Sequence, residues 1–149
     1  MSKISRVDSL KDYFSRVFVY QSKIDANKNR IKELRYVLES PSSASFGVRV
    51  QEMRKFDRIE NIVAKITQLE EEIKAYSLKL LKLEEEIVLL GNILESPLQK
   101  AVIIWRYICK LPWEEISDRA ELSEMKLFRE HRSALQVMAG VMPCLRLAS

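Results

Sequence analysis

Apolar residues recur at alternating steps of three and four between residues 59 and 94, which is the spacing of one face of an α-helix. The pattern holds over five heptads without a break, as in helices that bury one seam against another helix. We predict a helix at about residues 57–95. At a rise of roughly 1.5 Å per residue it would be about 55 Å long, so it needs a partner helix to be stable. The predicted hairpin or oligomer seam consists of Ile59, Ile62, Ile66, Leu69, Ile73, Tyr76, Leu80, Leu83, Ile87 and Leu90.

The N-terminal segment repeats this spacing less regularly, which predicts a first helix at about residues 8–39. Asp8 or Ser9 is the expected N-cap. Pro41 is expected to end the helix, because proline disfavours helical backbone in the residue before it. Asn27 is a polar residue in the apolar seam, and such residues fix the register or the partner of many helix pairs.

The connection between the two long helices is predicted at residues 40–56, which include Gly47 and a basic cluster. Residues 1–56 hold twelve Lys or Arg against six Asp or Glu, whereas residues 57–95 hold five against nine. This segregation allows the first helix either to attract the acidic second helix or to attract phosphate. The simplest arrangement is an antiparallel hairpin within one chain. The alternative is that the second helix also pairs with its copy in a homodimer.

A second helix-ending signal, Glu95–Pro97, is followed by a different pattern. Three short helices are predicted there, at Leu98–Cys109, Trp113–Ala120 and Glu124–Met138. Their spacing is that of a helix-turn-helix, in which one helix braces a second that lies in the major groove of DNA. We therefore predict an all-α protein: a long helical hairpin or coiled coil at residues 1–95, then a three-helix helix-turn-helix domain with a C-terminal tail at residues 96–149.

The last of these helices has an apolar side and a polar side. The apolar side is expected to face the core and consists of Leu127, His131, Ala134 and Met138. Ser123 is the expected N-cap, which leaves the N–H groups of the first turn directed toward phosphate. The residues predicted to bind DNA lie at this helix start and on the outward side: Ser123, Met125, Lys126, Arg129, Arg132 and Ser133.

The stretch "IIWRYICKLPWEEISDRAELSEMKLFREHRSAL" resembles the promoter-reading domain of sigma factors. It is more similar still to the phage and prophage transcription regulators of the RinA and ArpU type. The resemblance extends upstream through "DRIENIVAKITQLEEEI" and covers roughly residues 57–138. It implies DNA-binding control of phage genes in the cytoplasm of a bacterial host.

The resemblance also assigns roles to single positions. Lys126 and Arg129 fall where proteins of this type meet DNA. Two positions depart from the pattern: Pro112 replaces a small polar cap, and Glu121 stands where glycine is frequent. Glu121 therefore requires either left-handed backbone or a remodelled turn. The structural positions of the pattern are matched by Trp105, Tyr107, Trp113, Ile116, Leu127, Ala134 and Leu135.

The composition limits the kinds of chemistry that we expect of the chain. The chain has one histidine and two cysteines far apart, and no nucleophile–base pair is visible. We therefore predict no metal, no cofactor and no enzymatic activity. No apolar run approaches the roughly 20 residues of a membrane-spanning helix, and the N-terminus lacks the apolar core of a secretory signal. These features predict no membrane partner and a cytoplasmic location.

The function that the sequence predicts is sequence-specific binding to double-stranded DNA by a homodimeric transcription regulator. Two other classes stay open: a DNA-packaging or assembly protein similar to small terminase subunits, and a protein-only antagonist of a host factor. Glu114, Glu115 and Asp118 either favour the dipole at the start of their helix or form a contact surface for host RNA polymerase.

Overall fold

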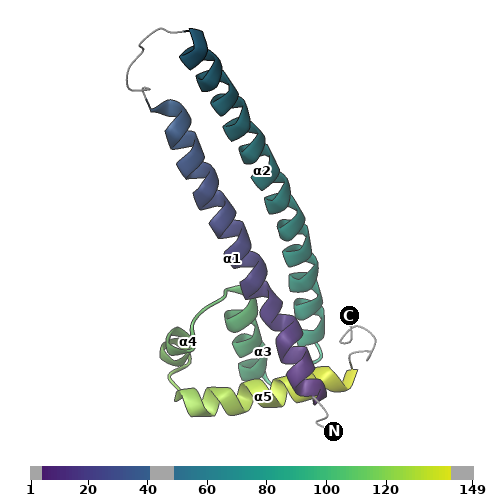
Figure 1. The fold of residues 1–149 in the computed structure, drawn as a ribbon. Coiled ribbons are helices and arrows are strands. Elements are labelled where there is room, and N and C mark those ends of the chain that lie inside the picture. Colours follow the sequence, from purple (N-terminus) through teal and green to yellow (C-terminus); the bar gives the residue numbers. More distant parts are fainter. Residues whose placement is uncertain (1–4, 41–48, 142–149) are drawn as a thin grey trace. The chain divides into compact units, whose positions relative to one another are not determined.

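The computed structural model describes residues 5–40 and 49–141, with side chains at all of these positions except 49–53. All regular secondary structure in the described residues is helical, so the predicted all-α fold class is confirmed. Figure 1 shows the two long helices and the shorter helices that follow them. The elements in chain order are α1 (Arg6–Glu39), α2 (Arg49–Gly91), α3 (Pro97–Ile103), a π-helical turn (Ile104–Ile108), α4 (Trp113–Ala120) and α5 (Glu124–Val141).

The chain divides into two units, and both long helices contribute to each of them. The hairpin unit is formed by residues 20–78, and the terminal unit by residues 1–19 together with 79–149. The units therefore do not divide at residue 95, where the sequence pattern placed the domain boundary. The start of α1 and the end of α2 belong with the short helices, because they supply part of the same core.

In the hairpin unit, α1 and α2 run antiparallel beside each other (Figure 1). Their seams meet in a core of four buried residues, Ile31, Leu34, Ile66 and Leu69. Leu38, Ile62 and Ile73 pack against this core. The polar interruption in the seam is also accommodated, since the amide nitrogen of Asn27 donates a hydrogen bond of 3.0 Å to the carboxylate of Glu72.

In the terminal unit, the first turns of α1 bury three apolar residues completely, Leu10, Phe14 and Val17. The ring of Phe14 packs edge-on against that of Tyr107 at a centroid distance of 5.3 Å. Tyr107 is itself 1% exposed. Aromatic pairs of this geometry add to the free energy gained from burial alone. The apolar spacing places Leu10, Tyr13 and Val17 in the seam of α1, so Phe14 lies beside that seam. It is nevertheless buried, because here the helix covers a core wider than one partner helix.

The sequence predicted Asp8 or Ser9 as the N-cap of α1, but the N-cap is Ser5. The hydroxyl oxygen of Ser5 accepts a hydrogen bond of 3.1 Å from the backbone N–H of Asp8. The same hydroxyl donates to the Asp8 carboxylate at 2.8 Å. A carboxylate in the first turn also interacts favourably with the helix dipole, so Asp8 stabilises the helix start from inside it.

The second long helix begins earlier and ends earlier than the predicted 57–95. It begins at Arg49, because residues 49–56 contain neither proline nor glycine and can extend the helix. Their apolar residues, Val50, Met53 and Phe56, recur at steps of three and lie outside the three–four alternation used for the prediction. It ends at Gly91, after which the N–H groups of Ile93 and Leu94 make tighter bonds to the carbonyls three residues back. The predicted connection at 40–56 therefore overlaps α2, and its residues 41–48 lie outside the described residues, as does the tail from 142 to 149.

The predicted short helix at Leu98–Cys109 is present as α3 and the π-helical turn that continues it. The N–H of Cys109 donates to the carbonyl of Ile104 at 2.9 Å, which closes this wider turn. Lys110 then adopts left-handed backbone with φ of 57°. The guanidinium of Arg106 fixes the exit of the chain by donating to the carbonyl of Leu111 at 2.9 Å.

Candidate nucleic-acid interface

The helix-turn-helix begins at α4, whose N-cap is Pro112 with extended backbone and no side-chain cap. The carbonyl of Pro112 accepts the first helical hydrogen bond, from Ile116, at 3.1 Å. Glu114 and Glu115 occupy the first turn. Their negative charges interact favourably with the N-terminal end of the helix dipole, which compensates for the missing polar cap.

In the turn between α4 and α5, Glu121 adopts left-handed backbone, one of the two possibilities that the sequence left open. Its φ and ψ are 56° and 40°, and its backbone N–H donates to the carbonyl of Ser117. The N–H of Leu122 also donates to that carbonyl, at 3.3 Å. The Ser117 hydroxyl in turn donates to the carbonyl of Leu122. These bonds satisfy the end of α4 as a glycine-type helix ending does, so the turn is retained although glycine is absent.

Ser123 is the N-cap of α5. Its hydroxyl oxygen accepts a hydrogen bond of 3.2 Å from the backbone N–H of Lys126. Its carbonyl accepts the first helical bond, from Leu127, at 3.1 Å. The cap fixes where α5 begins, and it therefore fixes which residues of the helix face outward.

The angle between α4 and α5 is filled by apolar side chains. Ile116 of α4, Leu127 of α5 and Val102 of α3 are fully buried and form one cluster. Ala120 and Leu122 pack against this cluster. The predicted inward side of α5 is also buried, and Leu135 and Ala139 extend it. The orientation of α5 is consequently held by a continuous core.

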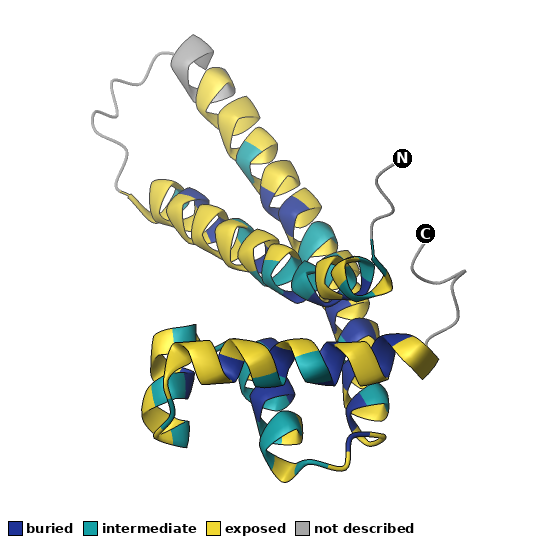
Figure 2. Cartoon of the chain, turned by 90° about the horizontal axis from the view of Figure 1, so that it is seen from below, coloured by how far each residue is buried: buried dark blue, intermediate teal, exposed yellow. Residues whose placement is uncertain are grey.

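The opposite side of α5 carries the predicted DNA-binding residues. Met125, Lys126, Arg129 and Arg132 are exposed, and Ser133 is half-buried. Figure 2 shows exposed and buried positions alternating along this helix. The structure therefore brings five of the six predicted residues onto α5, with Ser123 at its start.

Two of the cations on this face have carboxylate partners. Lys126 Nζ lies 2.9 Å from Glu130 Oε1. Glu130 also accepts a bond of 3.0 Å from the side-chain amide of Gln99. The hydrogen bonds from Lys126 and Gln99 lower the pKa of the Glu130 carboxyl. The second pair is exposed and longer, with Arg132 Nη1 at 3.7 Å from the Asp8 carboxylate of α1.

An aromatic residue on α5 was not singled out by the sequence pattern. Phe128 is 45% exposed, and its ring packs edge-on against Trp113 at 5.1 Å. The two rings border a hollow of about 350 Å³ that Lys11 and Arg132 also line. The sequence could have indicated Phe128, because it is a large apolar residue next to the inward position Leu127 but on the outward side of the predicted helix.

Below this surface, His131 is 5% exposed. Its Nε2 lies 2.7 Å from the hydroxyl of Tyr107, and Trp113 packs against its ring at 4.9 Å. Burial, together with the positive charges of Lys11 and Arg106, lowers the pKa of His131 to about 4. His131 is therefore a neutral core residue at physiological pH and supports α5 from behind.

The predicted seam of α2 serves the two units differently. In the hairpin unit it packs against α1, with Ile66 and Leu69 buried and Ile62, Ile73 and Tyr76 half-buried. Ile59, the first predicted position, is 39% exposed and lies outside the buried seam. In the terminal unit the seam continues through buried Leu80, Leu83 and Ile87 and half-buried Leu90.

Residues 5–40 and 49–141 contain no group of three or more His, Cys, Asp or Glu side chains arranged to hold a metal ion. Over the same residues, no helix combines the length and the apolarity needed to cross a membrane. The feature with the clearest chemistry is thus the capped, partly cationic face of α5.

The chain was compared with known proteins by sequence and by structure. No protein-family model matches it, and neither the curated proteins nor the solved structures gave a significant match.

Proposed function

We propose that the protein is a sequence-specific DNA-binding transcription regulator of a phage or prophage gene programme, and that α5 is its reading helix. The observation that carries the proposal is the α4–turn–α5 unit, in which Ser123 caps a helix that is buried on one side and exposes Lys126 and Arg129 on the other. A helix held in this way can enter the major groove and present its outer side chains to base edges.

Within the proposal, the side chains of α5 divide by role. Arg129 is exposed and suited to a bidentate contact with guanine. Lys126 must exchange its bond to Glu130 for a base or phosphate contact. Ser123 and Arg132 would contact the sugar-phosphate backbone of the DNA. Cytoplasmic location in a bacterial host follows from the same proposal.

The protein is further proposed to act as a homodimer. The terminal part of the chain from residue 96 holds eight Lys or Arg against six Asp or Glu, a small excess for a DNA-binding surface. Since each phosphate contact adds to affinity, a second copy would double the electrostatic term. Two reading helices would then require two related half-sites.

A second candidate function is recognition of a protein by the same face of α5. The observation that favours it is the exposure of Met125 at 74% and Phe128 at 45%, since exposed Met and aromatic side chains are common at protein interfaces. In that case the protein would act on a host factor, such as RNA polymerase, without contacting DNA.

Selection of bound fragments from a random-sequence duplex library tests the proposal. We expect enrichment of one sequence with two related half-sites, and an affinity that decreases linearly with salt on a logarithmic scale. Absence of enrichment together with absence of binding at low salt would refute the proposal and favour the second candidate.

A further inference from the structure

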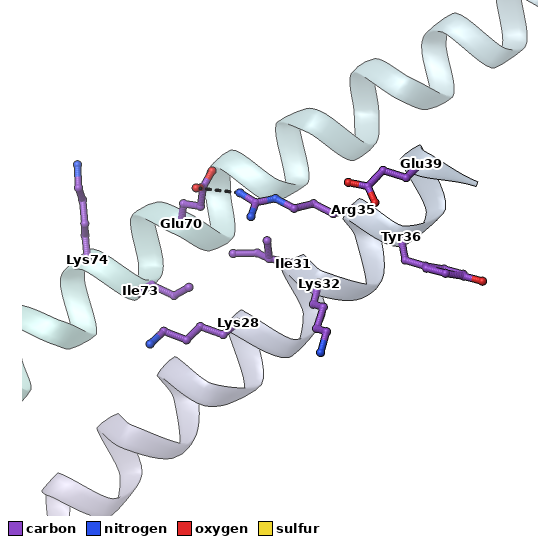
Figure 3. A pocket seen from close by; sticks show the side chains of 9 residues that line it. All are labelled: Lys28, Ile31, Lys32, Arg35, Tyr36, Glu39, Glu70, Ile73 and Lys74. Atoms are coloured by element: carbon purple, nitrogen blue, oxygen red, sulfur yellow. Dashed lines mark ion pairs between the residues drawn. The ribbon is translucent and has the colours of Figure 1, made fainter. Parts of the chain in front are cut away.

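The hairpin unit carries an open groove along the contact between α1 and α2, with a volume of about 750 Å³ (Figure 3). Its basic residues are Lys28, Lys32 and Arg35 from α1 and Lys74 from α2. The groove lies far along the chain from α5, and the function proposed above makes no use of it.

The three lysines of the groove are exposed. Among the residues that the structure describes, none of the three forms an ion pair. Arg35 contacts Glu70 at 3.5 Å, and both of these side chains are more than half exposed. An exposed pair of this kind contributes little free energy, so Arg35 can exchange its partner at low cost.

The spacing of these cations suits an extended anion. Lys28 and Lys32 are one helical turn apart, and Arg35 follows on the same side, which spreads the three charges over about 10 Å of helix. In Figure 3 Lys74 extends from α2 and away from Lys28 and Lys32, so the cations of the groove are spread over both helices. Lysine binds phosphate as a point charge, and its flexible stem adapts to a repeating backbone.

We propose that this groove binds the sugar-phosphate backbone of duplex DNA without sequence preference. The proposal extends the DNA-binding function proposed for α5, but it concerns a different surface and can be tested separately. Backbone contacts of this kind raise affinity and position a protein on the duplex, whereas base contacts supply the sequence preference.

The floor of the groove argues against a protein partner. Ile31 is only 7% exposed because it is used in the core of the hairpin. Protein interfaces obtain most of their affinity from a few apolar or aromatic side chains that insert into pockets. Ile73 beside it is half-buried, and apart from Tyr36 the remaining polar groups of the groove are charged, four cations with Glu39 and Glu70, so charge is the main polar chemistry that the groove offers.

The aromatic residue of the groove argues against single-stranded nucleic acid. Tyr36 is 73% exposed, but in Figure 3 its ring extends away from Lys28 and Lys74. Proteins that bind single strands place aromatic rings beside their cations, so that bases stack while phosphates are neutralised. The groove holds one such ring, beside Lys32, and among its lining residues no second ring on which the next base could stack, so the geometry favours the duplex backbone.

The test compares two triple variants that remove the same charge. Lys28→Gln, Lys32→Gln and Lys74→Gln change the groove, whereas Lys65→Gln, Lys82→Gln and Lys100→Gln change exposed lysines outside it. Affinity for a random-sequence duplex is measured between about 50 and 200 mM salt. A third variant with arginine at the three groove positions keeps the charge and controls for the substitutions themselves, and circular dichroism confirms that all variants are helical.

We expect the groove variant to bind at least about tenfold more weakly at low salt, with a salt slope smaller by about 2.7, because each lost phosphate contact removes about 0.9. The arginine variant should retain the slope. Equal slopes in the groove and control variants would overturn the proposal. It would also be overturned if polyglutamate competed as well as duplex, or if single strands bound more tightly than duplex of equal charge.

The outcome separates the two proposals. If the groove variant lowers the salt slope of duplex binding but the protein shows no sequence preference, the groove proposal is supported and the role proposed for α5 is refuted. Sequence preference with a slope that is independent of the groove would sustain α5 and refute the groove.

Discussion

His131 affects the stability of the terminal unit through its protonation. The histidine is paired with Tyr107 in the core, and burial is the main reason why its pKa is lowered to about 4 from an ordinary value of 6.5. Between these two values, the unfolded chain binds a proton that the folded chain does not. The folded state is therefore favoured less as the pH decreases through this range.

The first prediction concerns this pH range. Acidification from pH 6.5 to pH 4 should lower the free energy of unfolding by up to about 3 kcal/mol through His131, whereas above pH 6.5 the effect should be no more than about 0.4 kcal/mol. Urea unfolding of the wild type and of His131→Gln across this range measures it. The variant should lack this part of the pH dependence, and identical pH profiles would contradict the assignment.

Glu121 is a second residue whose local conformation has a measurable cost. With φ of 56°, it occupies a region in which side chains are strained. Glu121→Gly should raise the free energy of unfolding by about 0.5–1 kcal/mol. Asp118→Gly, within α4, is the matched control and should lower it by a similar amount. If both substitutions lower the free energy of unfolding, residue 121 does not have the left-handed backbone described here.

Glu130 competes with DNA for Lys126 in the proposed interface. Glu130→Gln removes this ion pair and one negative charge from the exposed side of α5. Affinity for the selected duplex should therefore rise about threefold to tenfold, as expected for about 1 kcal/mol. Glu85→Gln removes the same charge from α2 and should leave affinity unchanged. A Glu130→Gln variant that binds no more tightly than Glu85→Gln would count against Lys126 as a contact residue.

At the scale of the elements, the stability of the hairpin unit depends on a small seam. Ile66→Ala should lower the local free energy of unfolding by about 2–3 kcal/mol, because a buried side chain is lost from a core of four residues. Val63, which is 48% exposed on the same helix, is the control, and Val63→Ala should change it by less than about 0.5 kcal/mol. Native-state hydrogen exchange in α2 resolves the two effects. Equal protection in both variants would mean that the seam does not stabilise this unit.

The helices could be predicted from the sequence where periodicity and capping agree. Trp113–Ala120 has its predicted bounds, since Pro112 begins it and the turn at Glu121 ends it. The start of α2 was not predicted, because the apolar residues of its first turns, Val50, Met53 and Phe56, recur only at steps of three and do not continue the three–four alternation. The three–four spacing of apolar residues indicates the side of a helix that is buried, so it does not detect a helical segment that is exposed.

The candidate site could be predicted only in part. Its outward residues follow from helical spacing, and so does the i,i+4 relation of Lys126 and Glu130. The approach of Arg132 to Asp8 and the packing of Phe14 on Tyr107 connect segments that are far apart in the chain. No local pattern encodes such contacts, and for the same reason the boundary at residue 95 did not anticipate the two units.

At the scale of the whole molecule, charge is distributed over two surfaces with different proposed roles. The terminal unit carries α5, the proposed reading helix, where a few side chains would select a sequence. The hairpin unit carries the lysine groove, where charge alone would add affinity. The first of these roles rests on the central claim that α5 contacts DNA.

The most direct test of that claim is the affinity of Lys126→Ala combined with Arg129→Ala for the selected duplex. Arg58→Ala combined with Lys82→Ala removes the same charge from exposed positions of α2 and is the control. Loss of two base or phosphate contacts should weaken binding at least about 30-fold, since each good contact contributes about 1–3 kcal/mol. Helix content and thermal unfolding should stay at wild-type values, and the control should bind nearly as the wild type does. A Lys126 and Arg129 double variant that binds as tightly as this control would contradict the account.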